Sequence, residues 1–210
     1  MNIDNLIITL NQDADQIASY CKTLTSPEIK VITLDIFVIG SGQRTIYLID
    51  GFLDSILKGN FVCTAPIIRM NLDTLLRIIF IMKHGTEEIL SQFVEGKAFR
   101  NIKDQDGRKL TDQRLREYAR PHYKWIDPVY EQTSDFVHLS SRHFYSHVTI
   151  VNSDISNIHF RYGRPAIEWM KKEDVFEHCA AMQTISSNVK IMIEKYIKHR
   201  PNIHLGRPIA

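Results

Sequence analysis

The chain has 210 residues, of which 44% are hydrophobic and 24% are charged, and its formal net charge is +2. This length and this ordinary composition predict a single globular domain, residues 1–210, with a sizeable hydrophobic core. The small net charge gives no electrostatic reason to expect a nucleic acid or a membrane surface as a partner.

The cysteines and the N-terminal residues bear on the cellular compartment. Cys21, Cys63 and Cys179 are widely spaced and odd in number, and they form no CxxC pair. This usage is typical of reduced thiols rather than of a disulfide framework. The chain begins with MNIDNLIITL, which contains an acidic residue and no basic one, unlike a signal peptide. We therefore expect a cytoplasmic protein.

Two helices are predicted in the first part of the chain. Apolar residues at helical spacing over 4–22 indicate an amphipathic helix. Ser26-Pro27-Glu28 has the cap, the proline and the acid of a helix start, and this helix should continue past Gly40 and Gly42 to Gly59. Each internal glycine destabilises a helix by about 1 kcal/mol. The two glycines therefore either kink the helix or allow a neighbouring element to approach closely.

The stretch 65–84, APIIRMNLDTLLRIIFIMKH, is the expected centre of the fold. It is apolar on almost every side, which is typical of a buried helix. Pro66 suits the first helical turn, and Gly85 after Lys83 and His84 suits the end. A membrane span is not expected, because charged residues interrupt the run of about 20 apolar residues that a span requires.

Those charged residues, Arg69, Asp73 and Arg77, form what we call the charged stripe. They are spaced at i, i+4 and i+8, so they lie along one side of the helix. One interpretation is a structural ion-pair ladder, because buried charges must be paired. The other is functional: one carboxylate cannot fully neutralise two arginines, and the remaining guanidinium would face a polar pocket.

Shorter elements are predicted after the central helix. Thr86-Glu87-Glu88 begins a helix, and the polar residues 100–114 indicate an exposed loop with a turn at Asp106-Gly107. Thr111-Asp112 begins another helix, and a further helix is expected over 128–145.

The last third of the chain contains one β signal and one long helix. HVTIV and NIHFRY flank a turn cluster, which predicts a small hairpin near 147–162. Residues 171–199 have the apolar spacing of a long amphipathic helix. The predicted fold class is therefore mainly all-α, a multi-helix bundle with one small β-hairpin.

A candidate ligand site combines the charged stripe with the 128–145 helix. Asp135, His138 and Arg142 share one face of that helix. If this face packs on the charged stripe, three arginines meet two acids, and the excess guanidinium invites a small anionic ligand such as a phosphate or a carboxylate. The structural alternative is a network closed by backbone carbonyls, buried water and histidine. In either case no cofactor is expected, since no glycine-rich phosphate loop and no GxSxG motif is present.

The segment 142–147, Arg-His-Phe-Tyr-Ser-His, matches R-x4-H. It resembles the motif of the helical HEPN ribonucleases. The resemblance implies metal-independent RNA cleavage in stress or phage defence, with Arg142 stabilising the phosphate and His147 assisting attack by the 2′-hydroxyl. It also implies RNA as a partner and a possible homodimer. Whether the protein is an enzyme stays open between this function and the binding of a small anionic ligand or a partner in a polar pocket between residues 65–84 and 128–147.

A metal site is a third interpretation of the same segment. His143 and His147 are four residues apart, a spacing at which two imidazoles can bind zinc, with Asp135, His138 or His159 as a third ligand. No glutamate follows the first histidine, as it does in HExxH. We therefore predict no bound metal.

A longer pattern bears on the fold alone. It runs from Arg69-x-x-x-Asp73 to Y-x-x-T-S-x-F-V-H-L-S over 130–140. It resembles a family of uncharacterised all-helical bacterial proteins over residues 65–147. That resemblance implies a helical fold and no particular activity.

Overall fold

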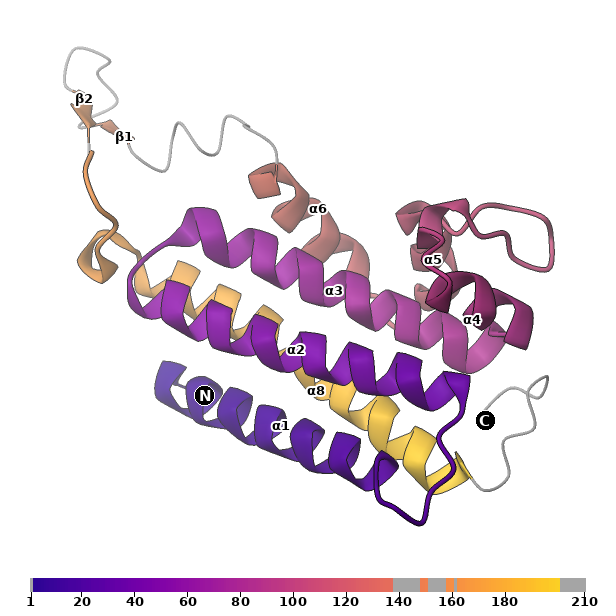
Figure 1. The fold of residues 1–210 in the computed structure, drawn as a ribbon. Helices are drawn as coiled ribbons and strands as arrows, with labels where there is room; N and C mark the ends of the chain where they lie inside the picture. Colours follow the sequence, from indigo (N-terminus) through magenta and orange to yellow (C-terminus); the bar gives the residue numbers. More distant parts are fainter. Residues whose placement is uncertain (1, 138–147, 151–157, 161, 201–210) are drawn as a thin grey trace.

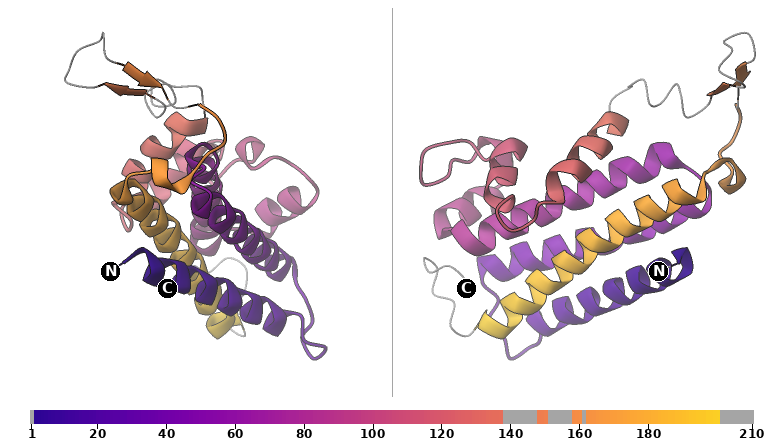
Figure 2. Two further views of the ribbon diagram at one scale, coloured as in Figure 1. Left: turned by 90° about the vertical axis from the view of Figure 1, so that its left-hand side faces the viewer. Right: turned by 180° about the vertical axis from the view of Figure 1, so that it is seen from behind.

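Four long helices lie side by side and form the body of the molecule (Figures 1 and 2). The computed structural model describes residues 2–137, 148–150, 158–160 and 162–200. The long helices are α1 (Ile3–Leu24), α2 (Thr33–Leu57), α3 (Phe61–His84) and α8 (Lys172–His199). Along the chain, α3 and α8 are separated by shorter elements: α4 (Glu87–Val94), η1 (Phe99–Asn101), α5 (Asp112–Ala119), α6 (Ile126–Val137), β1 (Val148–Ile150), β2 (Ile158–Phe160) and η2 (Ile167–Trp169). The prediction of a mainly helical bundle is confirmed.

Helix α3 is the centre of this arrangement, as its apolar sequence predicts. It packs against α2, α8, α5 and α6. Side chains such as Ile68, Leu72, Leu75 and Ile79 are completely covered. Burial of one such side chain contributes about 1.5–3 kcal/mol of hydrophobic free energy. The apolar side chains of α3 therefore explain why this helix lies at the centre of the bundle.

The first residues of α2 and of α3 differ from the expected boundaries. Helix α2 begins at Thr33 rather than near Ser26, and the Ile32 backbone N–H donates a 2.8 Å hydrogen bond to the carboxylate of Asp35. Helix α3 begins at Phe61, because Asn60 caps it by accepting from the Cys63 N–H. Pro66 therefore lies inside α3 and not in its first turn.

The glycines of α2 have different surroundings. A Cβ added to Gly42 would lie 2.7 Å from Cys21 Sγ on α1 and 3.2 Å from Ile193 Cδ1 on α8. Glycine at this position therefore permits the close approach of three helices, the second of the two alternatives raised by the sequence. A Cβ added to Gly40 would meet nothing within 4 Å.

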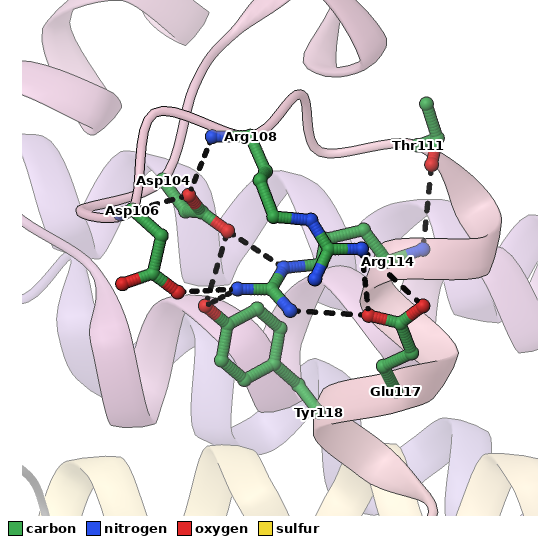
Figure 3. Close-up of polar contacts among 7 residues, drawn as sticks. All are labelled: Asp104, Asp106, Arg108, Thr111, Arg114, Glu117 and Tyr118. Atoms are coloured by element: carbon green, nitrogen blue, oxygen red, sulfur yellow. Dashed lines mark hydrogen bonds and ion pairs between the residues drawn. The ribbon is translucent and has the colours of Figure 1, made fainter.

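Residues 100–114, predicted as an exposed loop with a turn at Asp106-Gly107, are mostly exposed, and Gly107 has a positive φ of 74°, so the expectation agrees with the structure up to the start of α5. The sequence did not reveal the hydrogen-bond network that holds this loop, which Figure 3 shows. The Asp104 carboxylate accepts hydrogen bonds from Arg114 Nε at 2.7 Å and from the Tyr118 hydroxyl at 3.1 Å. Arg114 also pairs with Asp106 at 2.6 Å and with Glu117 at 3.1 Å. This network holds the turn against α5, and a polar sequence by itself does not reveal it.

The short strands β1 and β2 pair in an antiparallel register with Val148 opposite Phe160. The residues that would join them, 151–157, lie outside the described part of the chain. The hairpin near 147–162 therefore stays a prediction.

Candidate functional site

The first arginine of the charged stripe belongs to a closed structural cluster. The Arg69 side chain is 8% exposed and donates hydrogen bonds to Asp73 on its own helix and, at 2.9 Å, to Asp112 at the start of α5. Its guanidinium lies 3.7 Å from the ring centre of Tyr130 on α6. The sequence did not predict Asp112 as the second carboxylate, because it is far along the chain from Arg69. In the sequence, Asp112 is recognisable only as part of a helix start.

Tyr130 also attaches α6 to α5. The Arg116 guanidinium lies 4.0 Å from the same ring centre and donates to Asp127 at 2.9 Å. Stacking of guanidinium groups on an aromatic ring is favourable, and more so where water is excluded. The α5–α6 contact thus includes paired charges and an aromatic ring.

The second arginine of the stripe, Arg77, is held differently. Its guanidinium lies 3.9 Å from Asp73 and 3.8 Å from Asp112, so it is within ion-pair range but beyond hydrogen-bond distance of both carboxylates. The Arg77 side chain is only 29% exposed, yet it donates no hydrogen bond to any residue that the structure describes. Burial lowers the pKa of Arg77, while Asp112 raises it and the nearby Arg44 lowers it further. A guanidinium still remains charged in a protein.

Arg77 faces a cleft between α2, α3 and α4, which we call the α2–α4 cleft. Its volume is about 450 Å³, within the range of small-molecule sites. The cleft is lined by Ile36, Phe37, Gly40, Ser41 and Arg44 of α2, by Asp73, Thr74 and Arg77 of α3, and by Phe93 and Val94 of α4.

One side of this cleft is cationic. The Arg44 Nε donates a 3.1 Å hydrogen bond to the Thr74 hydroxyl, and Arg44 has no carboxylate partner among the described residues. Together with Arg69 and Arg77 it makes three arginines near two carboxylates, Asp73 and Asp112. Among the described residues, one positive charge is therefore left without a counterpart, and it lies at the cleft.

The other side is apolar. Phe37 and Phe93 contact each other edge to face, with ring centres 5.6 Å apart. Ile36 and Val94, which flank them, are 52% and 49% exposed. Single exposed apolar residues are common on protein surfaces. Here, however, they border the same cleft as the arginines.

The remaining predicted site residues are not brought into this cleft within the described part of the chain. Asp135 lies on α6 and is exposed, and it does not line the cleft. His138, Arg142 and His147 lie outside the described residues. Their expected roles in ligand binding and in RNA cleavage therefore stay predictions.

A smaller cavity of about 200 Å³ lies elsewhere on α3. Its lining includes Lys83, His122, Lys195 and Met192. We take the α2–α4 cleft as the candidate site because it is larger and contains two residues of the charged stripe.

The described residues contain neither a candidate metal cluster nor a candidate membrane span. Among them, no three histidine, cysteine, aspartate or glutamate side chains lie close enough together to hold a metal ion. His143 and His147 fall outside this part of the chain, so the zinc alternative is not tested. The described helices include none with the length and apolar character to span a membrane.

Comparison of the chain with protein-family models, with curated proteins and with solved structures finds no match. The fold and the cleft together define a helical-bundle protein with an arginine-lined cleft.

Proposed function

We propose that this protein binds a small anionic ligand in the α2–α4 cleft through Arg77 and Arg44. The observation that carries the proposal is the state of Arg77. Its guanidinium is mostly covered, lines the cleft, and has hydrogen-bond donors that no described residue accepts from.

The contrast with Arg69 supports a binding role. Both arginines lie near the same two carboxylates, Asp73 and Asp112. Arg69 donates hydrogen bonds to both of them, whereas Arg77 stays beyond hydrogen-bond distance of either. A purely structural ladder would satisfy the two arginines alike. Asp73 and Asp112 instead hold the Arg77 guanidinium by charge and leave its N–H groups available.

The chemistry of the ligand follows from these donors. A guanidinium presents a planar fork of N–H groups that matches a carboxylate or a phosphate bidentately. Arg44 adds a second cation, and the hydroxyl of Ser41 lies in the same lining. The common feature of suitable ligands is therefore a small, planar or tetrahedral anionic oxygen group.

The experiment is a titration of the purified protein with acetate and with inorganic phosphate, followed by chemical-shift changes in its NMR spectrum. We expect saturable shifts around the cleft and an affinity at least about tenfold weaker in Arg77→Gln, because a charge-assisted hydrogen bond contributes about 1.5–3 kcal/mol. Arg100→Gln is the matched control, since Arg100 is exposed and lies outside the cleft. Equal affinity in the wild type and Arg77→Gln, or no saturable binding of either anion, would overturn the proposal.

A further inference from the structure

Gly40 occupies a position where packing does not require glycine. It lies in the interior of α2, where glycine is less favourable than alanine because it loses more backbone freedom on folding. Gly42, two residues later, is required by the contact of α2 with Cys21. At Gly40, in contrast, an added Cβ meets nothing within 4 Å.

The space that Gly40 leaves open belongs to the α2–α4 cleft. Gly40 lines the cleft together with Ile36 and Phe37 of α2 and Phe93 and Val94 of α4. A side chain at this position would therefore begin in open space and extend into the cleft. The glycine therefore maintains volume in the apolar part of the candidate site.

We infer that the ligand of the α2–α4 cleft is an organic acid with an apolar body, of the kind represented by a medium-chain carboxylic acid. This inference rests on the proposed anion-binding function. The acid group is held by Arg77 and Arg44, and the apolar body lies over Gly40 between Ile36 and Val94.

The apolar lining is the physical reason for an amphipathic ligand. Ile36 and Val94 are about half exposed, and their burial under an alkyl chain removes apolar surface from water. The Phe37–Phe93 pair supplies a further apolar surface beside them. A small inorganic anion would contact the arginines and leave this half of the cleft in water.

The test is a series of straight-chain carboxylates, butanoate, hexanoate and octanoate, titrated by isothermal calorimetry. A fully buried methylene strengthens binding about fourfold, so affinity should rise from butanoate to octanoate. Gly40→Leu fills the open space and should weaken octanoate binding at least about tenfold, with a smaller effect on butanoate. Leucine is a good helix former, so this variant should keep the thermal stability of the wild type.

Two controls separate the filling of the cleft from other effects. Gly40→Ala adds little volume and should bind octanoate better than Gly40→Leu. Gly51→Ala alters the same helix outside the cleft, where the added Cβ meets only Ile67 at 3.8 Å, and should bind as the wild type does.

The outcomes distinguish this inference from the proposed function. Equal affinity for all three acids, or unchanged octanoate binding in a folded Gly40→Leu variant, overturns the inference and leaves the anion site intact. Undiminished binding of every acid by Arg77→Gln overturns the proposed function itself, whether or not chain length matters.

Discussion

The hydroxyl of Tyr196, near the end of α8, donates a 2.6 Å hydrogen bond to the fully buried carboxylate of Asp35 at the start of α2. Arg200 donates two further hydrogen bonds to the same carboxylate, at 2.7 and 2.8 Å. Burial opposes the charged form of Asp35, but the hydrogen bonds from Arg200, Tyr196 and the Ile32 N–H together lower its pKa. The end of the last long helix is thus fastened to the beginning of α2.

Removal of this contact should destabilise the bundle. We expect Tyr196→Phe to lower the free energy of unfolding by about 1–2 kcal/mol, the cost of one lost hydrogen bond. Asp35→Ala should cost roughly 3–5 kcal/mol, because it leaves the Arg200 charge without its partner. Urea denaturation measures both. Tyr162→Phe, at a side chain that is 87% exposed, is the control and should change stability little.

The glycines of α2 should respond to alanine in opposite directions. We expect Gly42→Ala to destabilise the protein by about 1–3 kcal/mol, because the new methyl group overlaps Cys21 and forces the helices apart. Gly40→Ala should stabilise it by up to about 1 kcal/mol, since alanine is the better helix former. Thermal unfolding of the two variants tests this, and a stabilised Gly42→Ala variant would contradict the close packing of α1, α2 and α8.

His178 should make stability depend on pH. Burial lowers the pKa of His178 to about 4, and its Nδ1 lies 3.0 Å from the Thr64 hydroxyl. In the unfolded chain this imidazole takes up a proton near pH 6.5. The stability provided by neutral His178 is therefore complete above about pH 6.5 and is lost as the pH falls toward 4.

The measurement is the free energy of unfolding as a function of pH, for the wild type and for His178→Gln. We expect a steeper fall in the wild type between about pH 6.5 and 4. His84, whose pKa is also lowered by burial, remains in both proteins. The difference in pH dependence between the two curves is therefore caused by His178. Parallel curves across this interval would be inconsistent with a buried neutral imidazole.

Asp112 should weaken anion binding at the α2–α4 cleft, because its carboxylate lies 3.8 Å from Arg77. We expect Asp112→Asn to bind the carboxylates several-fold more tightly, consistent with the ~0.2–1 kcal/mol of a partly exposed ion pair. The same change should lower stability, since Arg69 loses a charged acceptor. Calorimetry and urea denaturation together check both effects. Unchanged or weaker affinity in the folded variant would exclude an electrostatic link between Asp112 and the cleft.

The ribonuclease alternative makes a separate prediction for residues outside the described part of the chain. If Arg142 and His147 form a HEPN-like site, the purified protein should cleave a mixed RNA in the presence of EDTA, and His147→Ala should abolish cleavage. Cleavage that EDTA removes would instead indicate a metal site such as His143 and His147. If the wild type cleaves no RNA, this alternative is excluded as stated.

Much of the helical framework could be predicted because its signals are local. Thr86 and Thr111 cap α4 and α5 as expected, each accepting a hydrogen bond from a backbone N–H three residues later. The long C-terminal helix was expected over 171–199 and extends over Lys172–His199. Caps and apolar spacing act within one or two helical turns, so the order of residues is enough to reveal them.

The start of α2 and the network of residues 100–114 depend on partners that are distant in sequence. Helix α2 begins where Asp35 meets the end of α8, and residues 100–114 are ordered because Asp104 binds Arg114 and Tyr118. A sequence pattern contains the charges of such pairs but not their pairing.

The sequence by itself determined that this protein is a mainly helical bundle centred on an apolar helix, and that this helix carries two arginines around one aspartate. Only the tertiary structure decided which of the two arginines donates hydrogen bonds to carboxylates. Asp112 arrives from α5 within hydrogen-bond distance of Arg69 and not of Arg77. Arg44 and Gly40 of α2 complete the lining of the cleft. Hydrogen bonds depend on separations of a few tenths of an ångström between groups on different helices, and packing alone sets those separations.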